Sequence, residues 1–301
     1  MIITNLKGGL GNQMFQYATG LSLSKKNNTV LLLDISGYSD QRILNSDTPR
    51  FFDLKHFEIS AKIADSEQVK KTKYSHDLIS KICRGINKKI LKKNYQDFHP
   101  ELLINISDKI SKNPNHNIYL DGFFQSEKNF SKIRPALLQE FQLKPELITD
   151  QVKYFQRQIT GLDSNRNSIS IHIRRGDYVK NPQTKKYHGL CPLLYYRDSI
   201  DLIAESIDHP HFFIFSDDTE WVKENLKISF NNTFVSGLGL SPQQELYLMS
   251  KCSHNIIANS SFSWWGAWLN KNINKIVIAP EKWTVKNTEH PNIIPAGWIK
   301  I

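Results

Sequence analysis

Two adjacent arginines and an aspartate follow an alternating apolar run at residues 171–178, which read IHIRRGDY. Arg174 and Arg175 have planar guanidinium groups, each able to bind two phosphate oxygens at once. Asp177 is placed to hold one of these groups in an ion pair or to act as a general base. The stretch therefore predicts either a site for a doubly charged anion or a structural ion pair.

Polar residues also lie at the carboxyl ends of two later predicted strands, 211–216 and 255–259: Asp217, Asp218, Asn259, Ser260, Ser261 and Ser263. Ligands of open parallel sheets bind beyond the carboxyl ends of the strands, so the three clusters predict one convergent site that includes Asp218. Ser260 and Ser261 begin a predicted helix, whose free N–H groups and dipole favour an anion. Together with the arginines this set fits a diphosphate. The alternative is that Arg174 pairs with Asp177 and the serines only cap the helix.

A glycine-rich stretch, GGLGNQ, lies at residues 8–13 between a predicted strand and a predicted helix. Gly9 and Gly11 allow the backbone to approach a ligand closely. The spacing is not that of a Walker A loop, because no Gly-Lys-Ser/Thr follows. It is also not G-x-G-x-x-G, because residue 14 is Met14. The loop is either a tight turn or a second ligand-binding loop.

Alternating strands and helices predict an α/β protein with mostly parallel sheets covered on both faces. The predicted strands are 1–6, 29–35, 168–173, 211–216, 233–237, 255–259 and 275–280, with another near 117–124. The predicted helices are 13–26, 192–207, 242–252 and 261–269, with a short one around Trp221. A length of 301 residues favours two domains. Residues 161–167, GLDSNRN, resemble a linker, so we predict domains 1–158 and 159–301.

The formal net charge of +10 is compatible with nucleic acid, an anionic membrane or phosphorylated small molecules as partners. Nucleic acid is disfavoured because the chain lacks a basic stripe interleaved with aromatic residues. No apolar run approaches the length of a membrane span, and Asn5 and Lys7 interrupt the N-terminal apolar run, which argues against a signal peptide. The three cysteines form no disulfide or zinc pattern. These features predict a soluble, cytoplasmic protein.

Residues 77–93 form an amphipathic pattern with an apolar face and a basic face. One interpretation is a surface helix whose basic face is exposed to solvent and whose apolar face packs on the protein core. The other is peripheral attachment to the anionic cytoplasmic leaflet of the inner membrane.

The tryptophans at 264, 265 and 268 have helical spacing after a buried strand. These rings could stack on sugar rings, but we predict that they are core residues.

Four motifs resemble those of bacterial α-1,2-fucosyltransferases, which modify surface polysaccharides: GGLGNQMFQYA, HIRRGDY, FSDD and NSSFSWWGAWL. These enzymes are part of the wider α-1,2, α-1,6 and protein O-fucosyltransferase superfamily. The similarity extends from residue 5 to about residue 270 and is weak over 36–118. It implies a GT-B fold of two facing Rossmann-like domains. It also implies metal-independent, inverting transfer of fucose from GDP-L-fucose to O2 of a terminal galactose in O-antigen or capsule synthesis.

The resemblance implies a role for several residues of the C-terminal, GDP-fucose-binding domain. Arg174 matches the arginine that holds the β-phosphate of GDP, with Arg175 beside it, and His172 matches the histidine beside the guanine. Glu245 stands where the superfamily usually has aspartate and would accept hydrogen bonds from guanine N1 and N2. The turn that receives the phosphates is matched by Ser260, Ser261 and Phe262.

In the N-terminal, acceptor-side domain, Asn12 matches the asparagine of the glycine-rich loop. Asp177 is the nearest candidate for the general base, although it could instead orient an arginine. Asp121 and Glu127 are the alternatives. The expected acceptor is a galactose-terminated glycan, including lipid-linked forms.

We expect no metal cofactor, because Asp217-Asp218 lacks the Asp-x-Asp spacing of metal-dependent transferases and the histidines are scattered. Arginine would take the place of the metal ion at the departing phosphate. Two rival hypotheses are a GT-B transferase for a different nucleotide sugar and a basic nucleic-acid-binding protein. The second leaves the polar clusters at the strand ends unexplained.

Overall fold

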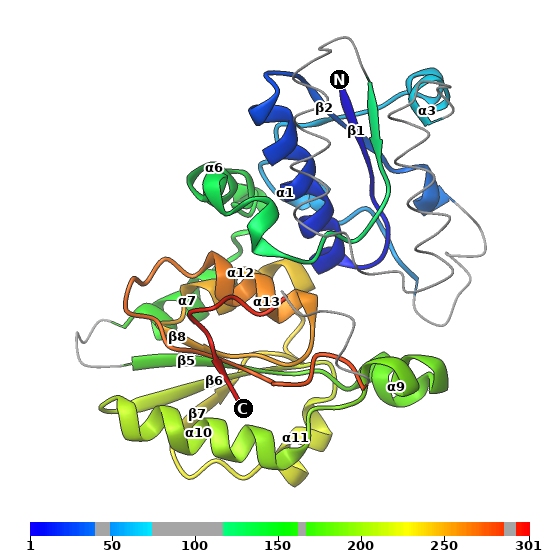
Figure 1. The fold of residues 1–301 in the computed structure, drawn as a ribbon. Coiled ribbons are helices and arrows are strands. Elements are labelled where there is room, and N and C mark those ends of the chain that lie inside the picture. The colour runs from blue at the N-terminus through cyan, green and yellow to red at the C-terminus, as the bar shows by residue number, and fades with distance from the viewer. Residues whose placement is uncertain (40–48, 74–116, 162–166, 286–292) are drawn as a thin grey trace. The chain divides into compact units, whose positions relative to one another are not determined.

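The chain folds into two compact units, seen in a computed structural model that describes residues 1–39, 49–73, 117–161, 167–285 and 293–301. The first unit comprises Met1–Phe141 with Glu289–Ile293, and the second comprises Gln142–Thr288 with Ile294–Ile301. Each unit has a parallel β-sheet with helices packed on it (Figure 1). The predicted α/β class is confirmed. The amphipathic segment 77–93 lies outside the described residues.

The first unit has a four-stranded sheet with the order β3-β2-β1-β4, in which every neighbouring pair is parallel. Its strands are β1 (Ile2–Asn5), β2 (Leu31–Asp34), β3 (Lys62–Ile63) and β4 (Ile118–Leu120). Its helices are α1 (Leu10–Lys26), η1 (Ser36–Ser39), η2 (Leu54–His56), α3 (Ser66–Lys73), η3 (Glu127–Asn129), η4 (Ser131–Ile133) and α6 (Arg134–Glu140). Because β2 and β4 lie on opposite sides of β1, the chain reverses its winding direction at the carboxyl end of β1.

The glycine-rich loop joins β1 to α1. Gly8 has a φ of +79°, a backbone conformation that costs a glycine little and other residues much. Gly9 is the N-cap of α1, so the helix begins at Leu10, three residues before the predicted start. Most of α1 is buried, and Lys25 and Lys26 in its last turn complement the helix dipole.

The second unit has a six-stranded parallel sheet with the order β10-β9-β8-β5-β6-β7. Its strands are β5 (Asn167–Ile173), β6 (Pro210–Ser216), β7 (Asn231–Phe234), β8 (His254–Ile256), β9 (Val277–Ala279) and β10 (Ile299–Lys300). Its helices are η5 (Pro145–Leu147), α7 (Asp150–Thr160), α8 (Gly176–Lys180), α9 (Pro182–His188), α10 (Leu193–Ser206), α11 (Thr219–Asn225), α12 (Pro242–Lys251) and α13 (Ser261–Leu269). The strand order is that of a doubly wound dinucleotide-binding fold, and it reverses between β5 and β8.

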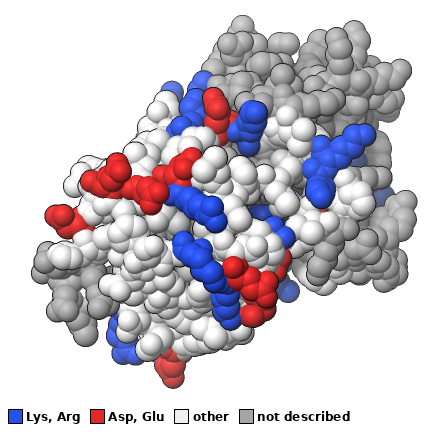
Figure 2. Space-filling model, turned by 90° about the horizontal axis from the view of Figure 1, so that it is seen from below, with Lys and Arg blue, Asp and Glu red and all other residues white. Residues whose placement is uncertain are grey.

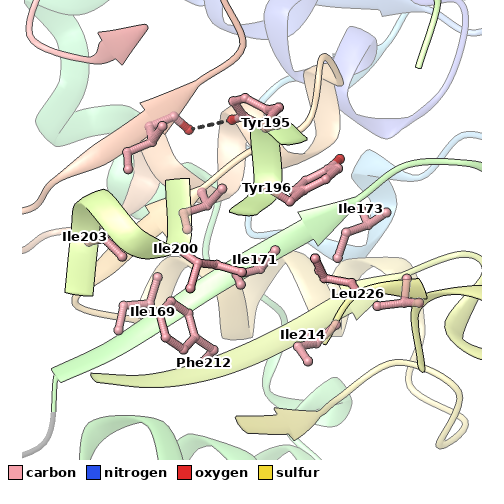
Figure 3. Packing of buried hydrophobic residues seen from close by; sticks show 13 residues of the cluster. Ile169, Ile171, Ile173, Tyr195, Tyr196, Ile200, Ile203, Phe212, Ile214 and Leu226 are labelled. Atoms are coloured by element: carbon pink, nitrogen blue, oxygen red, sulfur yellow. Dashed lines mark hydrogen bonds between the residues drawn. The ribbon is translucent and has the colours of Figure 1, made fainter. Parts of the chain in front are cut away.

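Strand β5 is buried on both faces, with apolar side chains on one face and polar side chains on the other. Ile169, Ile171 and Ile173 point towards α10 and pack in the main apolar cluster of this unit (Figure 3). Because side chains alternate along a strand, Ser170 and His172 point to the opposite face, where α12 and α13 lie (Figure 1). The alternation therefore directs His172 towards the helix that follows β8.

A buried tyrosine of α10, Tyr195, forms hydrogen bonds with the backbone near β8 and β9. The Tyr195 hydroxyl lies 2.6 Å from the backbone carbonyl oxygen of Ile257, to which it donates. It also lies within hydrogen-bond distance of the Ile278 carbonyl, at 3.2 Å (Figure 3), which accepts a backbone hydrogen bond from Ile257 as well. The bond to the Ile257 carbonyl, just beyond β8, helps to fix α10 on the sheet.

The tryptophans of α13 are core residues, as predicted. Trp264 and Trp265 are fully buried, and Trp268 is 4% exposed. Trp264 lies with its ring centroid 5.0 Å from that of Trp265 and 5.5 Å from that of Trp298 near the C-terminus. Aromatic burial of this extent anchors α13, and the loop before it, to the second unit.

The division between the units lies at residues 141 and 142, whereas the predicted one, between 158 and 159, falls inside α7. Helix α7 buries Val152, Phe155 and Ile159 in the second unit. The Tyr247 hydroxyl of α12 also donates to Gln156 of α7 at 2.9 Å. These contacts explain why α7 belongs to the second unit.

Among the helices of the described residues, none has the length and apolar character needed to cross a bilayer.

Substitution Ile171→Ala tests the core of the second unit. Ile171 is fully buried, so we expect the free energy of unfolding to fall by about 2–5 kcal/mol. Ile273→Ala is the matched control, because Ile273 is 94% exposed and its loss should change stability by less than about 0.5 kcal/mol. Urea unfolding followed by circular dichroism measures both. Equal effects of the two substitutions would contradict the described core.

Candidate active site

The predicted polar clusters of the second unit meet where the sheet reverses its winding direction. β5 and β8 are neighbouring parallel strands, so their carboxyl ends lie side by side. Arg174 follows β5 directly, and Asn259 and Ser260 lie three and four residues beyond the end of β8. In open α/β sheets this position is the ligand-binding crevice.

Arg174 is held by two carboxylates. Its Nη2 donates to Asp177 Oδ1 at 2.7 Å, and its Nη1 forms an ion pair with Asp217 Oδ2 at 2.9 Å. Burial disfavours the charged guanidinium, but Asp217 and Asp177 outweigh this and raise the pKa of Arg174. A guanidinium has five N–H groups, more than these two carboxylates engage, and the side chain is 24% exposed, so N–H groups remain for a ligand.

Arg175 faces a different set of partners. Its Nε donates to Asp218 Oδ2 at 3.0 Å, and its guanidinium carbon lies 3.5 Å from the ring centroid of Trp221. Its backbone N–H donates to Asp217 Oδ1 at 2.8 Å. The cation–π contact and the ion pair fix this side chain against α11, while the backbone bond places Asp217 next to Arg174.

The five ionic side chains of this cluster have a formal charge of −1, since two guanidinium groups face three carboxylates: Arg174, Arg175, Asp177, Asp217 and Asp218. Figure 2 shows Lys and Arg interspersed with Asp and Glu on the described part of the face in view. Anion binding at this cluster would therefore depend on directed N–H groups rather than on a local excess of positive charge.

His172 contributes a neutral ring. It is 4% exposed, and its ring centroid lies 5.4 Å from that of Phe262 in α13. Burial, together with the nearby charge of Arg174, lowers the pKa of His172 to about 3. Its Nδ1 is buried without a hydrogen-bond partner among the described residues. A buried ring nitrogen without a partner is uncommon in folded proteins, which makes His172 a candidate site residue.

Ser260 and Ser261 lie at the start of α13, as predicted. Ser260 is the N-cap residue, yet its side chain makes no capping hydrogen bond. The first-turn N–H groups of α13 are therefore not satisfied by a Ser260 cap, in contrast to α12, where Ser241 and Gln244 form a complete capping box. The alternative that Ser260 acts only as a helix cap is not supported.

Glu245 lies in the first turn of α12 and is partly buried. Burial raises its pKa to about 7, a hydrogen bond with Ser236 opposes this shift, and the charge of Asp217 adds to it. The effect of Asp217 indicates that Glu245 lies near the cluster of charges after β5 and β6. A carboxyl group with this pKa changes its charge near neutral pH.

In the first unit, the glycine-rich loop is held in a single arrangement. The buried amide of Gln13 donates to the carbonyls of Gly8 at 3.1 Å and Phe51 at 2.8 Å. Asn12 Oδ1 accepts a hydrogen bond from Gln125 Nε2 at 2.7 Å. Gly9 and Gly11, which we also assigned to the site, are part of this loop. The loop therefore presents a preorganised backbone.

Asp121, an alternative candidate for the base, follows β4 in the first unit. Its Oδ1 accepts from Lys7 Nζ at 2.6 Å and from Asn5 Nδ2 at 3.0 Å. The predicted site residues thus form two groups, one in each unit.

No group of three or more His, Cys, Asp or Glu side chains able to hold a metal ion occurs within the described ranges.

The contacts of three residues of the second-unit site were not predicted from the sequence. Asp217 is the second partner of Arg174, Trp221 packs on Arg175, and Tyr178 donates to the carbonyl of Asn259 at 3.1 Å. The position of Asp217 directly after a predicted strand was the signal for the first. The contacts of Trp221 and Tyr178 depend on the tertiary structure.

The sequence profile of the family described as "Glycosyl transferase family 11" matches residues 1–301. The chain belongs to glycosyl transferase family 11. Two relatives from Escherichia coli match this chain over nearly their whole length. The α-1,2-colitosyltransferase is 33% identical over 100% of this chain and 99% of the relative. The O-antigen biosynthesis glycosyltransferase WbnK is 34% identical over 98% and 99%.

A more distant relative is the galactoside 2-α-L-fucosyltransferase Sec1 of Mus musculus, 25% identical over 89% of this chain and 64% of the relative. Among solved structures, NodZ α-1,6-fucosyltransferase soaked with GDP-fucose has a TM-score of 0.52 at 14% identity, covering 89% of this chain and 91% of that one. Arabidopsis thaliana FUT1 has a TM-score of 0.53 at 15% identity, covering 96% and 72%. This likeness confirms the expected GT-B-type fold class.

Gly176→Ala tests the arrangement around Arg174. A Cβ at Gly176 would lie 2.5 Å from Asp217 Oδ2, so the carboxylate must move away from the guanidinium. We expect glycosyl transfer to fall by about 10- to 100-fold, because misplaced catalytic donors lose transition-state stabilisation. Gly297→Ala is the control, since nothing lies within 4 Å of its added Cβ. Unchanged turnover in Gly176→Ala would mean that Asp217 does not orient Arg174 for the reaction.

Proposed function

We propose that this chain is an inverting α-1,2-fucosyltransferase, which transfers L-fucose from GDP-L-fucose to O2 of a terminal β-galactoside during surface polysaccharide synthesis. The main support is the Arg174 guanidinium, which is oriented by two carboxylates and retains N–H groups for a ligand at the carboxyl end of β5. The names of the family 11 relatives support transfer of a deoxy sugar to a 2-position and a role in O-antigen synthesis.

In the proposed reaction, O2 of the acceptor galactose attacks C1 of fucose from the face opposite GDP. The bond between C1 and the β-phosphate oxygen breaks, and its electron pair remains on GDP. Arg174 donates hydrogen bonds to the β-phosphate, where negative charge increases in the transition state. The first turn of α13, with Ser260 and Ser261, adds N–H and hydroxyl donors to the phosphates.

The acceptor hydroxyl must lose its proton to a base. Asp177 was the first candidate, but its Oδ1 accepts a hydrogen bond from Arg174 and its side chain is only 9% exposed. Because the ion pair occupies one carboxylate oxygen and little of the side chain is accessible, these contacts favour an orienting role for Asp177. Asp121 and Glu127 of the first unit, together with Asn12, remain our proposals for the acceptor side.

Guanine recognition is assigned to Glu245, His172 and Phe262. The Glu245 carboxylate would accept hydrogen bonds from guanine N1 and N2. His172 is neutral at physiological pH and has an unpartnered Nδ1, so it can bond a base edge without attracting the phosphates. The ring of Phe262 lies against His172 and would give this part of the site an apolar wall.

A second candidate donor is GDP-colitose, because one full-length relative is an α-1,2-colitosyltransferase. Colitose is fucose without its 3-hydroxyl group, so the phosphate and guanine contacts proposed above would serve both donors. The choice depends on contacts with the sugar. We propose that the acceptor is a lipid-linked glycan at the cytoplasmic face of the inner membrane, in keeping with the O-antigen role named for the second relative.

A donor and acceptor screen tests the proposed function. We expect transfer from GDP-fucose to β-galactosides, with an α-1,2 linkage identified by NMR, and no transfer from UDP-glucose or UDP-galactose. Turnover with GDP-colitose and none with GDP-fucose would select the second candidate. Preferential use of a UDP-sugar would disprove both.

The pKa of Glu245 predicts a pH dependence of GDP binding. Only the carboxylate accepts the guanine N–H groups, and its pKa is about 7 in the free protein. The Kd for GDP should therefore rise as the pH falls below 7, by up to about tenfold per pH unit. Glu245→Gln is the control, since it removes this titration but retains that of the GDP phosphate. Calorimetric titrations between pH 5.5 and about 8 that give parallel curves for both proteins would refute the role of Glu245.

A further inference from the structure

We propose that Tyr178 and Asn259 are positioning residues of the phosphate site, which hold Arg174 and the first turn of α13 at a fixed spacing. The inference rests on the proposed function, because it concerns how the GDP-binding groups are kept in register. Neither residue is part of the set that the sequence motifs assigned to GDP-fucose.

Tyr178 links the arginine to the β8–α13 loop. Its ring centroid lies 5.7 Å from the guanidinium carbon of Arg174, within the range of a cation–π contact. Its hydroxyl donates to the backbone carbonyl of Asn259 at 3.1 Å. The side chain is 8% exposed, and burial raises its pKa, so the hydroxyl keeps its proton and remains a donor.

Asn259 is the next link and immediately precedes Ser260. It is 3% exposed, and both polar atoms of its side chain are used. Its Nδ2 donates to the carbonyls of His188 at 2.9 Å and Trp283 at 3.3 Å. Its Oδ1 accepts from the Cys191 thiol at 3.4 Å. A buried amide with this many partners has one orientation, because any rotation leaves polar groups unsatisfied.

The contacts close into a ring of three residues. Tyr178 bonds Asn259 through its hydroxyl, Asn259 bonds the backbone of His188, and the His188 ring stacks on Tyr178 with centroids 4.8 Å apart and planes 10° apart. Three mutually contacting residues from α8, α9 and the β8–α13 loop resist displacement better than a single bond does. A shift of one of them must break at least one contact of the ring.

The functional value of this ring follows from the geometry of a diphosphate. Its two phosphate groups are joined through one oxygen, so donors on β5 and donors on α13 must keep a set distance to bind both. Displacing a catalytic donor by about 1 Å is sufficient to reduce the rate by about 100-fold. The route through Tyr178 and Asn259 connects Arg174 to Ser260 by contacts of named atoms.

Tyr178→Phe removes the hydroxyl but retains the ring, so the protein should remain folded. We expect the Kd for GDP to rise about 5- to 10-fold, the effect of one hydrogen bond, and the Kd for GMP to change by less than about twofold. Tyr17→Phe is the matched control, because Tyr17 is also a buried tyrosine whose hydroxyl donates a hydrogen bond, but to Glu140 of the first unit at 2.6 Å. It should lower the melting temperature to a similar extent and leave both Kd values unchanged.

A double-mutant cycle with Arg174→Lys shows whether Tyr178 acts through the arginine. Arg174→Lys alone should raise the Kd for GDP, and in that background Tyr178→Phe should have less than about a twofold further effect. Equal effects of Tyr178→Phe in both backgrounds, equal losses for GDP and GMP, or no change in GDP affinity would overturn the inference while the proposed function stands. If Arg174→Lys leaves GDP affinity unchanged, the proposed phosphate role and the inference both fail.

Discussion

The ion pairs of Arg174 with Asp177 and Asp217 are the constraint on which the second-unit site depends. They keep a partly buried guanidinium charged and fix its plane, so that its remaining N–H groups have set directions before any ligand binds. Several backbone features serve this arrangement. Gly176 has no side chain to obstruct Asp217, and the short helix α8 returns Asp177 to the arginine three residues earlier. Because the local carboxylates outnumber the arginines, anion binding at this cluster would depend on geometry rather than on net charge.

Two neighbouring arginines with the same chemistry have different surroundings. Both follow β5, and the sequence analysis placed both in the phosphate site, with the β-phosphate contact assigned to Arg174. Arg174 has two carboxylate partners and unused N–H groups, whereas Arg175 is stacked on Trp221 and paired with Asp218. The contact with Trp221 comes from α11, which follows the next strand along the chain. A direct phosphate contact is therefore better supported for Arg174 than for Arg175.

The order of strands and helices was predictable wherever hydrophobic periodicity was strong. β5, β6, α10, α12 and α13 lie within a few residues of their predicted bounds. The convergence of the polar clusters followed from the rule for strand ends. The pairing of Arg174 with Asp177 was named as an alternative from the sequence. Its second partner was not predictable, because Asp217 is 43 positions away and reaches Arg174 only through the parallel register that pairs Ile173 with Ser216. Helices α8 and α9 were missed because five and seven residues are too few to show a helical period.

All six tryptophans of the chain, at positions 221, 264, 265, 268, 283 and 298, belong to the second unit. Indole emission therefore reports on that unit alone, and the first unit contributes only tyrosine and phenylalanine. Unfolding followed at once by fluorescence and by far-ultraviolet dichroism separates the two halves of the molecule without any added label. Trp221, stacked on Arg175 close to the charged cluster, adds a natural optical probe beside the candidate site.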